Sequence, residues 1–147
     1  MKTLTTSKPL FAMLLLLLSV LACNKLGTGS SSPTSAFKAF YEAQKNKDAA
    51  ALKKTLSKGS LDLLEKGAKE KKKTLDETLK EGFDDPAFKA PTMPETRNEK
   101  IDGNSATLEI QDADSKKWET MYFAKEDGEW KLALDKTLEE AFKKMGQ

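Results

Sequence analysis

The sequence predicts an α+β fold: helices in the first half, an antiparallel sheet of about four strands in the second, and a closing amphipathic helix. Apolar residues recur at helical spacing as far as Gly82. Polar and apolar residues then alternate on both sides of Asp127-Gly128, a dipeptide typical of two-residue hairpins. After Asp135 the helical spacing returns. Helices and strands that are grouped rather than alternating are typical of α+β domains.

The first helix is expected after Ser32, because serine is a good N-cap and Pro33 suits the first helical position. Helical spacing then places Phe37, Phe40 and Tyr41 on one face. A stripe of this kind is typical of a helix face that packs on a core. We therefore expect this helix to cover the sheet.

Three shorter helices are expected next. Asp48 caps the second helix, which ends at Gly59, and Ser60 caps the third. Residues 74–77 form a capping box, which predicts a break just before it and a fourth helix that ends at Gly82. The proline-containing segment that follows is expected to be irregular.

The strand register is predicted from the turns. A hairpin centred on Asp127-Gly128 pairs Phe123 with Leu132, and a four-residue turn at 114–117 places the preceding strand beside the same apolar face. The other expected pairs are Met121 with Leu134, Ile110 with Met121, and Leu108 with Phe123. A polar strand near 95–101 suits the sheet edge.

The closing helix has an apolar face formed by Leu138, Ala141, Phe142 and Met145. Two interpretations of this helix stay open. It caps an open end of the sheet, or it is an addition that faces a partner.

The beginning of the chain is typical of an export signal. Lys2 and Lys8 precede an uncharged run of 13 residues, 10–22. A membrane-spanning helix needs about 20 apolar residues, so this run is short for a span. The only cysteine of the chain, Cys23, follows it directly.

Residues 20–23, Val-Leu-Ala-Cys, resemble the lipobox of bacterial lipoprotein signals. The resemblance implies removal of residues 1–22 as a signal peptide and lipidation of Cys23, with fatty acyl chains such as palmitate holding the protein on the lipid bilayer of a cell membrane. Residues 23–32 would then be a lipidated, Gly/Ser-rich tether, followed by a single domain at 33–147. An ordinary cleaved signal and an uncleaved anchor are the alternatives.

The lipobox resemblance also implies a compartment. Asn24 stands where many inner-membrane lipoproteins of Gram-negative bacteria have aspartate. We therefore expect an outer-membrane protein that faces the periplasm, if the source is Gram-negative. Removal of residues 1–22 would leave 23 basic and 23 acidic residues, so no nucleic-acid partner is expected. We interpret the basic run at 69–73 as a solvated helix end, with contact to acidic lipid as the alternative.

Residues 36–43, 47–52 and 127–132 resemble the opening helices and the last hairpin of nuclear-transport-factor-2-like domains. The nearest likeness is to uncharacterised envelope lipoproteins of that superfamily, some described as resembling lumazine-binding proteins. The resemblance implies helices on a curved, cone-like sheet of the cystatin-like kind. It also implies a pocket, which Phe37, Phe40 and Tyr41 are placed to line.

No catalytic constellation is found in the sequence. The chain has no histidine, the usual base near neutral pH, and no cysteine besides Cys23. We interpret the acidic pairs Asp84-Asp85 and 112–114 as turn residues, with weak calcium contact as the alternative. No cofactor, no metal site and no catalytic residue are assigned.

Three aromatic residues are expected on the outer sheet face: Trp118, Tyr122 and Trp130. Together they would form an exposed patch that binds a protein partner or a second copy. The alternative is that the terminal helix or the curl of the sheet covers them.

We therefore expect a membrane-anchored envelope lipoprotein with a non-catalytic binding or scaffolding domain. The alternative is a small-ligand-binding or isomerase-like enzyme that uses the pocket of the same fold. An open pocket with a buried acid favours the alternative, whereas an interior filled by Phe37, Phe40, Met121 and Phe123 favours the first function.

Overall fold

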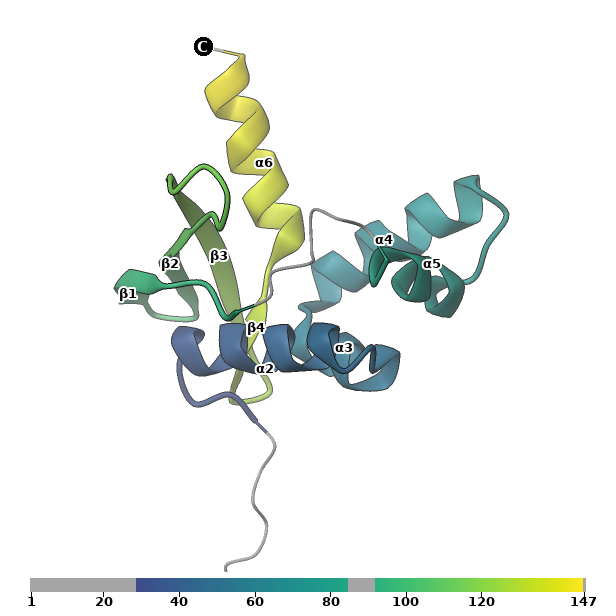
Figure 1. The fold of residues 1–147 in the computed structure, drawn as a ribbon, viewed down its shortest axis with the longest axis horizontal. Helices are drawn as coiled ribbons and strands as arrows, with labels where there is room; N and C mark the ends of the chain where they lie inside the picture. Colours follow the sequence, from purple (N-terminus) through teal and green to yellow (C-terminus); the bar gives the residue numbers. More distant parts are fainter. Residues whose placement is uncertain (1–28, 85–91, 147) are drawn as a thin grey trace, which may run out of the picture.

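Helices precede an antiparallel sheet and one further helix in the computed structural model, which describes residues 29–84 and 92–146 (Figure 1). The predicted α+β class and order of elements are confirmed. The helices before the sheet are α2 (Pro33–Lys45), α3 (Ala49–Thr55), α4 (Lys58–Glu70) and α5 (Leu75–Gly82). The strands are β1 (Thr96–Asp102), β2 (Ser105–Gln111), β3 (Trp118–Glu126) and β4 (Glu129–Leu132), and α6 (Leu134–Met145) follows them. The predicted signal peptide and Cys23 lie outside the described residues.

Helix α2 begins as the sequence predicts. The Ser32 hydroxyl accepts a hydrogen bond from the Ser35 amide at 3.1 Å, and the Ser35 hydroxyl accepts one from the Ser32 amide at 2.9 Å. Pro33 occupies the first turn, where its missing N–H costs nothing. Just before this cap Ser30 is buried, and its carbonyl accepts a hydrogen bond from the Trp130 amide at 2.9 Å. The described part of the expected tether therefore lies against β4.

The predicted boundary between α3 and α4 is wrong by about three residues. Gly59 lies inside the first turn of α4, and the N-cap is Ser57, whose hydroxyl accepts a hydrogen bond from the Ser60 amide at 3.1 Å. The chain leaves the helical conformation at Leu56 instead, because Leu56 forms a bridge with Leu132 of β4. A tertiary contact thus ends α3 before its glycine.

The capping box at α5 is confirmed. The Thr74 hydroxyl accepts from the Glu77 amide at 3.2 Å, and the Glu77 carboxylate accepts from the Thr74 amide at 2.7 Å. These hydrogen bonds hold the pKa of the Glu77 carboxyl below its usual value. The preceding break contains Lys72 at φ +56°, a left-handed conformation that ends α4. Helix α5 ends at Gly82, as predicted.

The sheet has the order β1-β2-β3-β4, and all three pairs are antiparallel. Asp127 and Gly128 have φ angles of +52° and +85°, as a turn with two left-handed residues requires. The predicted pairing of Phe123 with Leu132 is confirmed. Strand β1 forms the expected polar edge, and a register shift between Arg97 and Lys100 interrupts it, a feature that limits pairing with other chains.

The predicted register between β2 and β3 is wrong by two residues. Met121 pairs with Leu108 rather than with Ile110, because six residues rather than four connect the strands. Asp112 organises this longer loop, accepting a hydrogen bond from the Ser115 amide at 2.6 Å. A shift of two preserves the face of every side chain, so the apolar face is nevertheless as predicted.

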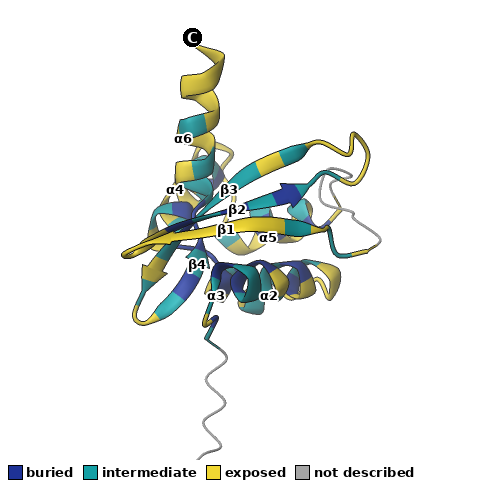
Figure 2. Cartoon of the chain, turned by 90° about the vertical axis from the view of Figure 1, so that its left-hand side faces the viewer, coloured by how far each residue is buried: buried dark blue, intermediate teal, exposed yellow. Residues whose placement is uncertain are grey.

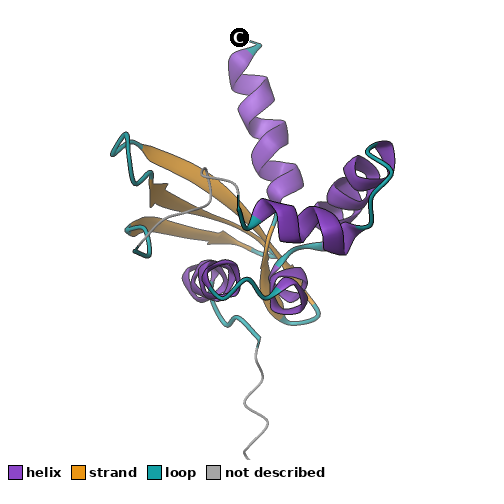
Figure 3. Cartoon of the chain, turned by 45° about the vertical axis from the view of Figure 1, so that its right-hand side comes forward, coloured by secondary structure: helices purple, strands orange, loops and turns teal. Residues whose placement is uncertain are grey.

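The core lies between α2 and one face of the sheet (Figure 2). Helices and sheet form two layers there, and α6 extends away from both of them (Figure 3). The buried residues of this core are Ala36, Phe37, Leu56, Ala106, Leu108, Ile110, Phe123, Trp130 and Leu132. A second cluster joins α2, α3 and α5 through Ala43, Leu52, Leu79 and Phe83.

Candidate functional site

The three residues expected to line a pocket lie in the packed interior. Phe37 is buried in the sheet core, and Phe40 packs against both clusters, with its ring centroid 6.5 Å from that of Phe37. Tyr41 is also buried. Phe123 is buried and Met121 packs beside it. Side chains of α2 and the sheet therefore pack together between that helix and the sheet.

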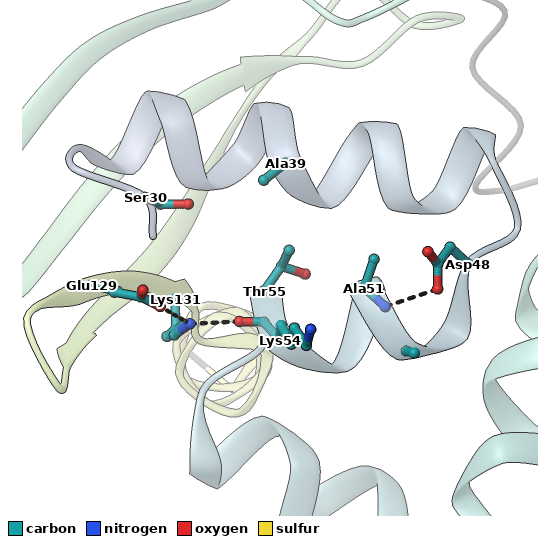
Figure 4. A pocket seen from close by; sticks show the side chains of 9 residues that line it. Ser30, Ala39, Asp48, Ala51, Lys54, Thr55, Glu129 and Lys131 are labelled. Carbon is teal, nitrogen blue, oxygen red and sulfur yellow. Dashed lines mark hydrogen bonds and ion pairs between the residues drawn. The ribbon is translucent and has the colours of Figure 1, made fainter. Parts of the chain in front are cut away.

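A groove of about 550 Å³ lies on another side of α2, between that helix, α3 and β4 (Figure 4). Lys131 lines it, with its ammonium donating to the Lys54 carbonyl at 2.6 Å and to the Glu129 carboxylate at 2.5 Å. At the other end Asp48 accepts from the Ala51 amide at 2.9 Å. The charged groups of Lys131, Glu129 and Asp48 thus bond to the local backbone and to one another.

The expected aromatic patch on the outer sheet face is not assembled. Trp130 is only 2% exposed and belongs to the core, so its predicted placement is wrong. Trp130 pairs with Lys125, which is two residues from Phe123 and therefore on the same face as Phe123. The predicted alternation of faces is therefore wrong by one residue at Trp130.

Trp118 and Tyr122 do lie on the opposite face, and both are half-buried. The Arg97 guanidinium covers Trp118, at 3.9 Å from its ring centroid. Arg97 also donates to Glu109 at 2.6 Å, and the hydrogen bonds from Arg97 and Asn98 hold the pKa of the Glu109 carboxyl below its usual value. Arg97 therefore covers one of the two aromatic residues on the outer face.

Three of the exposed large apolar side chains lie together on α6 instead. Leu138 is 46% exposed, Phe142 65% and Met145 72%. These three residues, which we call the α6 stripe, follow one face of the helix at spacings of four and three. At the base of the same face, Leu134 packs against the core. The stripe therefore begins next to the core and continues into solvent.

Buried hydroxyls fix the start of α6. Ser60, fully buried in α4, accepts a hydrogen bond from the Leu134 amide at 2.7 Å and donates to the Leu132 carbonyl at 3.0 Å. The Asp135 carboxylate lies 3.3 Å from the Ser57 hydroxyl and 3.2 Å from that of Ser60. Helix α6 has no side-chain cap of its own, so Ser60 supplies one from another helix.

Beyond its first turns α6 extends away from the domain, as three views of the chain show (Figures 1, 2 and 3). Its tip and the first described residues lie at opposite ends of the molecule (Figures 1 and 2). The α6 stripe is thus presented on the free part of a helix whose base is fixed. The sequence predicted this apolar face, but the spacing alone did not decide between a capping and a partner-facing role.

The other charged segments are engaged in surface ion pairs. In the basic run, Lys69 pairs with Glu65 at 2.9 Å and Lys73 with Glu81 at 2.6 Å. Such exposed pairs are typical of solvated helix ends. Within the described residues, no group of three or more Asp, Glu or Cys side chains is placed to hold a metal ion. Every helix in the described ranges is too short or too polar to cross a bilayer.

Comparison of the chain with family models, with curated proteins and with solved structures finds no match.

Proposed function

We propose that this chain is a lipid-anchored envelope protein whose domain is a non-catalytic binding module. The observation that supports binding is the α6 stripe. Core side chains are well packed, yet Phe142 and Met145 are more than half exposed on a helix that extends from the domain. Contiguous exposed apolar patches on a folded domain commonly mark sites of interaction with a protein or a membrane.

The sequence around Cys23 supports the anchor. Gly29, the first described residue, is six positions after Cys23, and an extended chain of this length spans about 20 Å. A lipid at Cys23 would thus hold the end of the domain near Ser30 close to the membrane. The α6 stripe lies at the opposite end (Figures 1 and 2), so it would point into the periplasm of a Gram-negative source.

The anchor is tested by fatty-acid labelling of the full chain in a bacterium. We expect label on the wild-type protein and none on Cys23→Ala, with Thr28→Ala as a control that keeps the cysteine. Two or three acyl chains anchor stably, whereas one chain binds marginally. Equal membrane recovery of Cys23→Ala and the wild type would contradict the lipid anchor.

The binding role is tested by chemical cross-linking of the tagged full chain in the same membranes. Replacement of both Phe142 and Met145 by serine is expected to abolish the cross-linked species. Replacement of the exposed Lys136, on the opposite face of the same helix, by serine is the control. A cross-linked species unchanged in the stripe variant would contradict this role for α6.

A further inference from the structure

The charged residues of α6 are ordered along the helix. Along α6, Glu139 and Glu140 come first, and Lys143 and Lys144 follow in the last turn. Glu139 flanks the α6 stripe, whereas Glu140 shares the face of Lys136. Within one copy Lys143 lies 3.0 Å from Glu139 and 2.7 Å from Glu140. These pairs are exposed and therefore free to exchange partners at little cost. The half of α6 that carries the free stripe is thus acidic first and basic last.

We propose that the α6 stripe pairs with the α6 stripe of a second copy, with the two helices antiparallel. If the two-fold axis lies between Ala141 and Phe142, Leu138 is level with Met145 of the second copy. Phe142 is then level with Ala141 of the second copy, and the Phe142 rings of the two copies lie next to each other at the axis. One register thus places apolar residues opposite apolar residues along the whole stripe.

The same register brings unlike charges together. Glu139, at one edge of the stripe, lies within about one residue of the level of Lys143 on the same edge of the other copy. A parallel pair would instead place glutamates beside glutamates and lysines beside lysines. Antiparallel helices also oppose their dipoles favourably. Charge order and apolar spacing therefore select the same arrangement.

The shape of the domain allows this arrangement. The overlap covers residues 138–145, about 12 Å of helix. Helix α6 extends away from the sheet and from α4 (Figures 1 and 3), so the two domains would lie at opposite ends of the helix pair. No described element of one copy needs to move.

A lipid surface is a less suitable occupant of the stripe. Helices that lie on membranes carry an excess of Lys and Arg on their polar face. Helix α6 has three basic and three acidic residues, which are Lys136, Lys143, Lys144, Asp135, Glu139 and Glu140. The stripe also lies at the opposite end of the molecule from Ser30, where the chain enters the domain (Figures 1 and 2).

The pairing is expected to be weak, because three large side chains per copy bury less than a standard interface does. Pairing at cellular concentrations therefore rests on the proposed function, since an anchor at Cys23 would concentrate the copies on one surface. The pairing geometry itself does not depend on the anchor.

The test uses a benzophenone amino acid in place of Phe142 in the full chain, produced in cells from two copies with different tags. Light is expected to give an adduct of twice the chain mass that carries both tags. The same probe at Lys136, on the opposite face of α6, is the control and should give at least several-fold less adduct. An adduct with another protein or with lipid, or no adduct, would overturn pairing of two copies.

These outcomes separate the two proposals. An adduct with a different protein would overturn self-pairing and leave α6 as a binding surface. A two-tag adduct together with unlabelled Cys23 would support self-pairing and contradict the anchor. No adduct from position 142 would contradict both self-pairing and the binding role of α6.

Charge reversal tests the antiparallel direction. With the probe at Phe142, E139K and K143E should each reduce the adduct several-fold, because like charges then face one another. Producing the two variants together should restore it, since a basic helix then meets an acidic one. Equal adduct from the wild type and from each variant alone would overturn the antiparallel register.

Discussion

The hydroxyl oxygen of Ser60 lies 2.7 Å from the backbone nitrogen of Leu134, so a serine in α4 caps the first turn of α6. Ser60 is fully buried, and it also donates to the Leu132 carbonyl. These hydrogen bonds join α4 to the junction of β4 and α6, more than 70 positions later in the sequence. They fix the base of the helix whose free part carries the α6 stripe.

Ser60→Ala is therefore expected to lower the free energy of unfolding by about 1–3 kcal/mol, because the Leu134 amide would lose its partner in a buried site. Chemical denaturation followed by circular dichroism measures this change. Ser105→Ala, at an exposed position of β2, is the control and should change stability by less than about 0.5 kcal/mol. Equal stability of both variants would contradict the capping role of Ser60.

Replacement of two phenylalanines by alanine is expected to lower stability by very different amounts. Phe37→Ala removes a ring that is 4% exposed and should cost about 3–5 kcal/mol of stability. Phe142→Ala removes a ring that is 65% exposed and should change stability by less than about 0.5 kcal/mol. A large loss of stability in Phe142→Ala would show that α6 packs on the domain more closely than described.

The two tryptophans are expected to differ in fluorescence. In Trp118→Phe only the buried Trp130 emits, so emission should be at shorter wavelength and resist quenching by iodide. In Trp130→Phe the half-buried Trp118 emits, and quenching should increase. Equal quenching of the two variants would contradict the burial of Trp130 in the core.

Stability is expected to be nearly constant between about pH 6 and 8, because the chain has no histidine. Several carboxyl groups have a pKa below the usual value because they accept hydrogen bonds in the folded state: Asp76, Glu77, Glu109, Asp112 and Glu139. Their ordinary pKa is 3.8 for aspartate and 4.5 for glutamate. As the pH falls, these carboxyl groups are therefore protonated at a higher pH in the unfolded chain than in the folded one.

These carboxylates thus contribute stability above about pH 4.5, and that contribution is lost as the pH falls through the lowered folded-state values. Thermal unfolding between pH 3 and 8 measures this. Glu77→Gln should make the acid-side decrease shallower, because the capping-box carboxylate no longer titrates. A loss of stability that begins between pH 6 and 7 would show that groups other than these carboxylates cause the loss of stability in acid.

Features that depend on nearby residues could be predicted from the sequence. The capping box at Thr74 and Glu77 and the turn at Asp127-Gly128 each need only a few adjacent side chains. Features that depend on distant contacts could not. Leu56 ends α3 because it pairs with Leu132, 76 positions later, and no local signal indicates this.

The candidate site follows the same division. The apolar face of α6 could be predicted from its spacing, whereas its exposure depends on where the helix points after Ser60 fixes its base. The hairpin turn predicts that Trp130 pairs with Lys125. The face of the sheet on which Trp130 lies follows from the face of Lys125, which is that of Phe123. The order of acidic and basic residues on α6 can be read from the sequence. It indicates a pairing direction only once the α6 stripe is known to be exposed.

We infer that a partner covers the α6 stripe when the protein is in its membrane. Hydroxyl-radical footprinting of the full chain compares oxidation of Phe142 and Met145 in membranes and after dilution in detergent. We predict that both side chains are protected several-fold in membranes and become reactive on dilution, while the exposed Ile101 of β1 reacts equally in both. Equal oxidation of Phe142 and Met145 in the two states would contradict the claim.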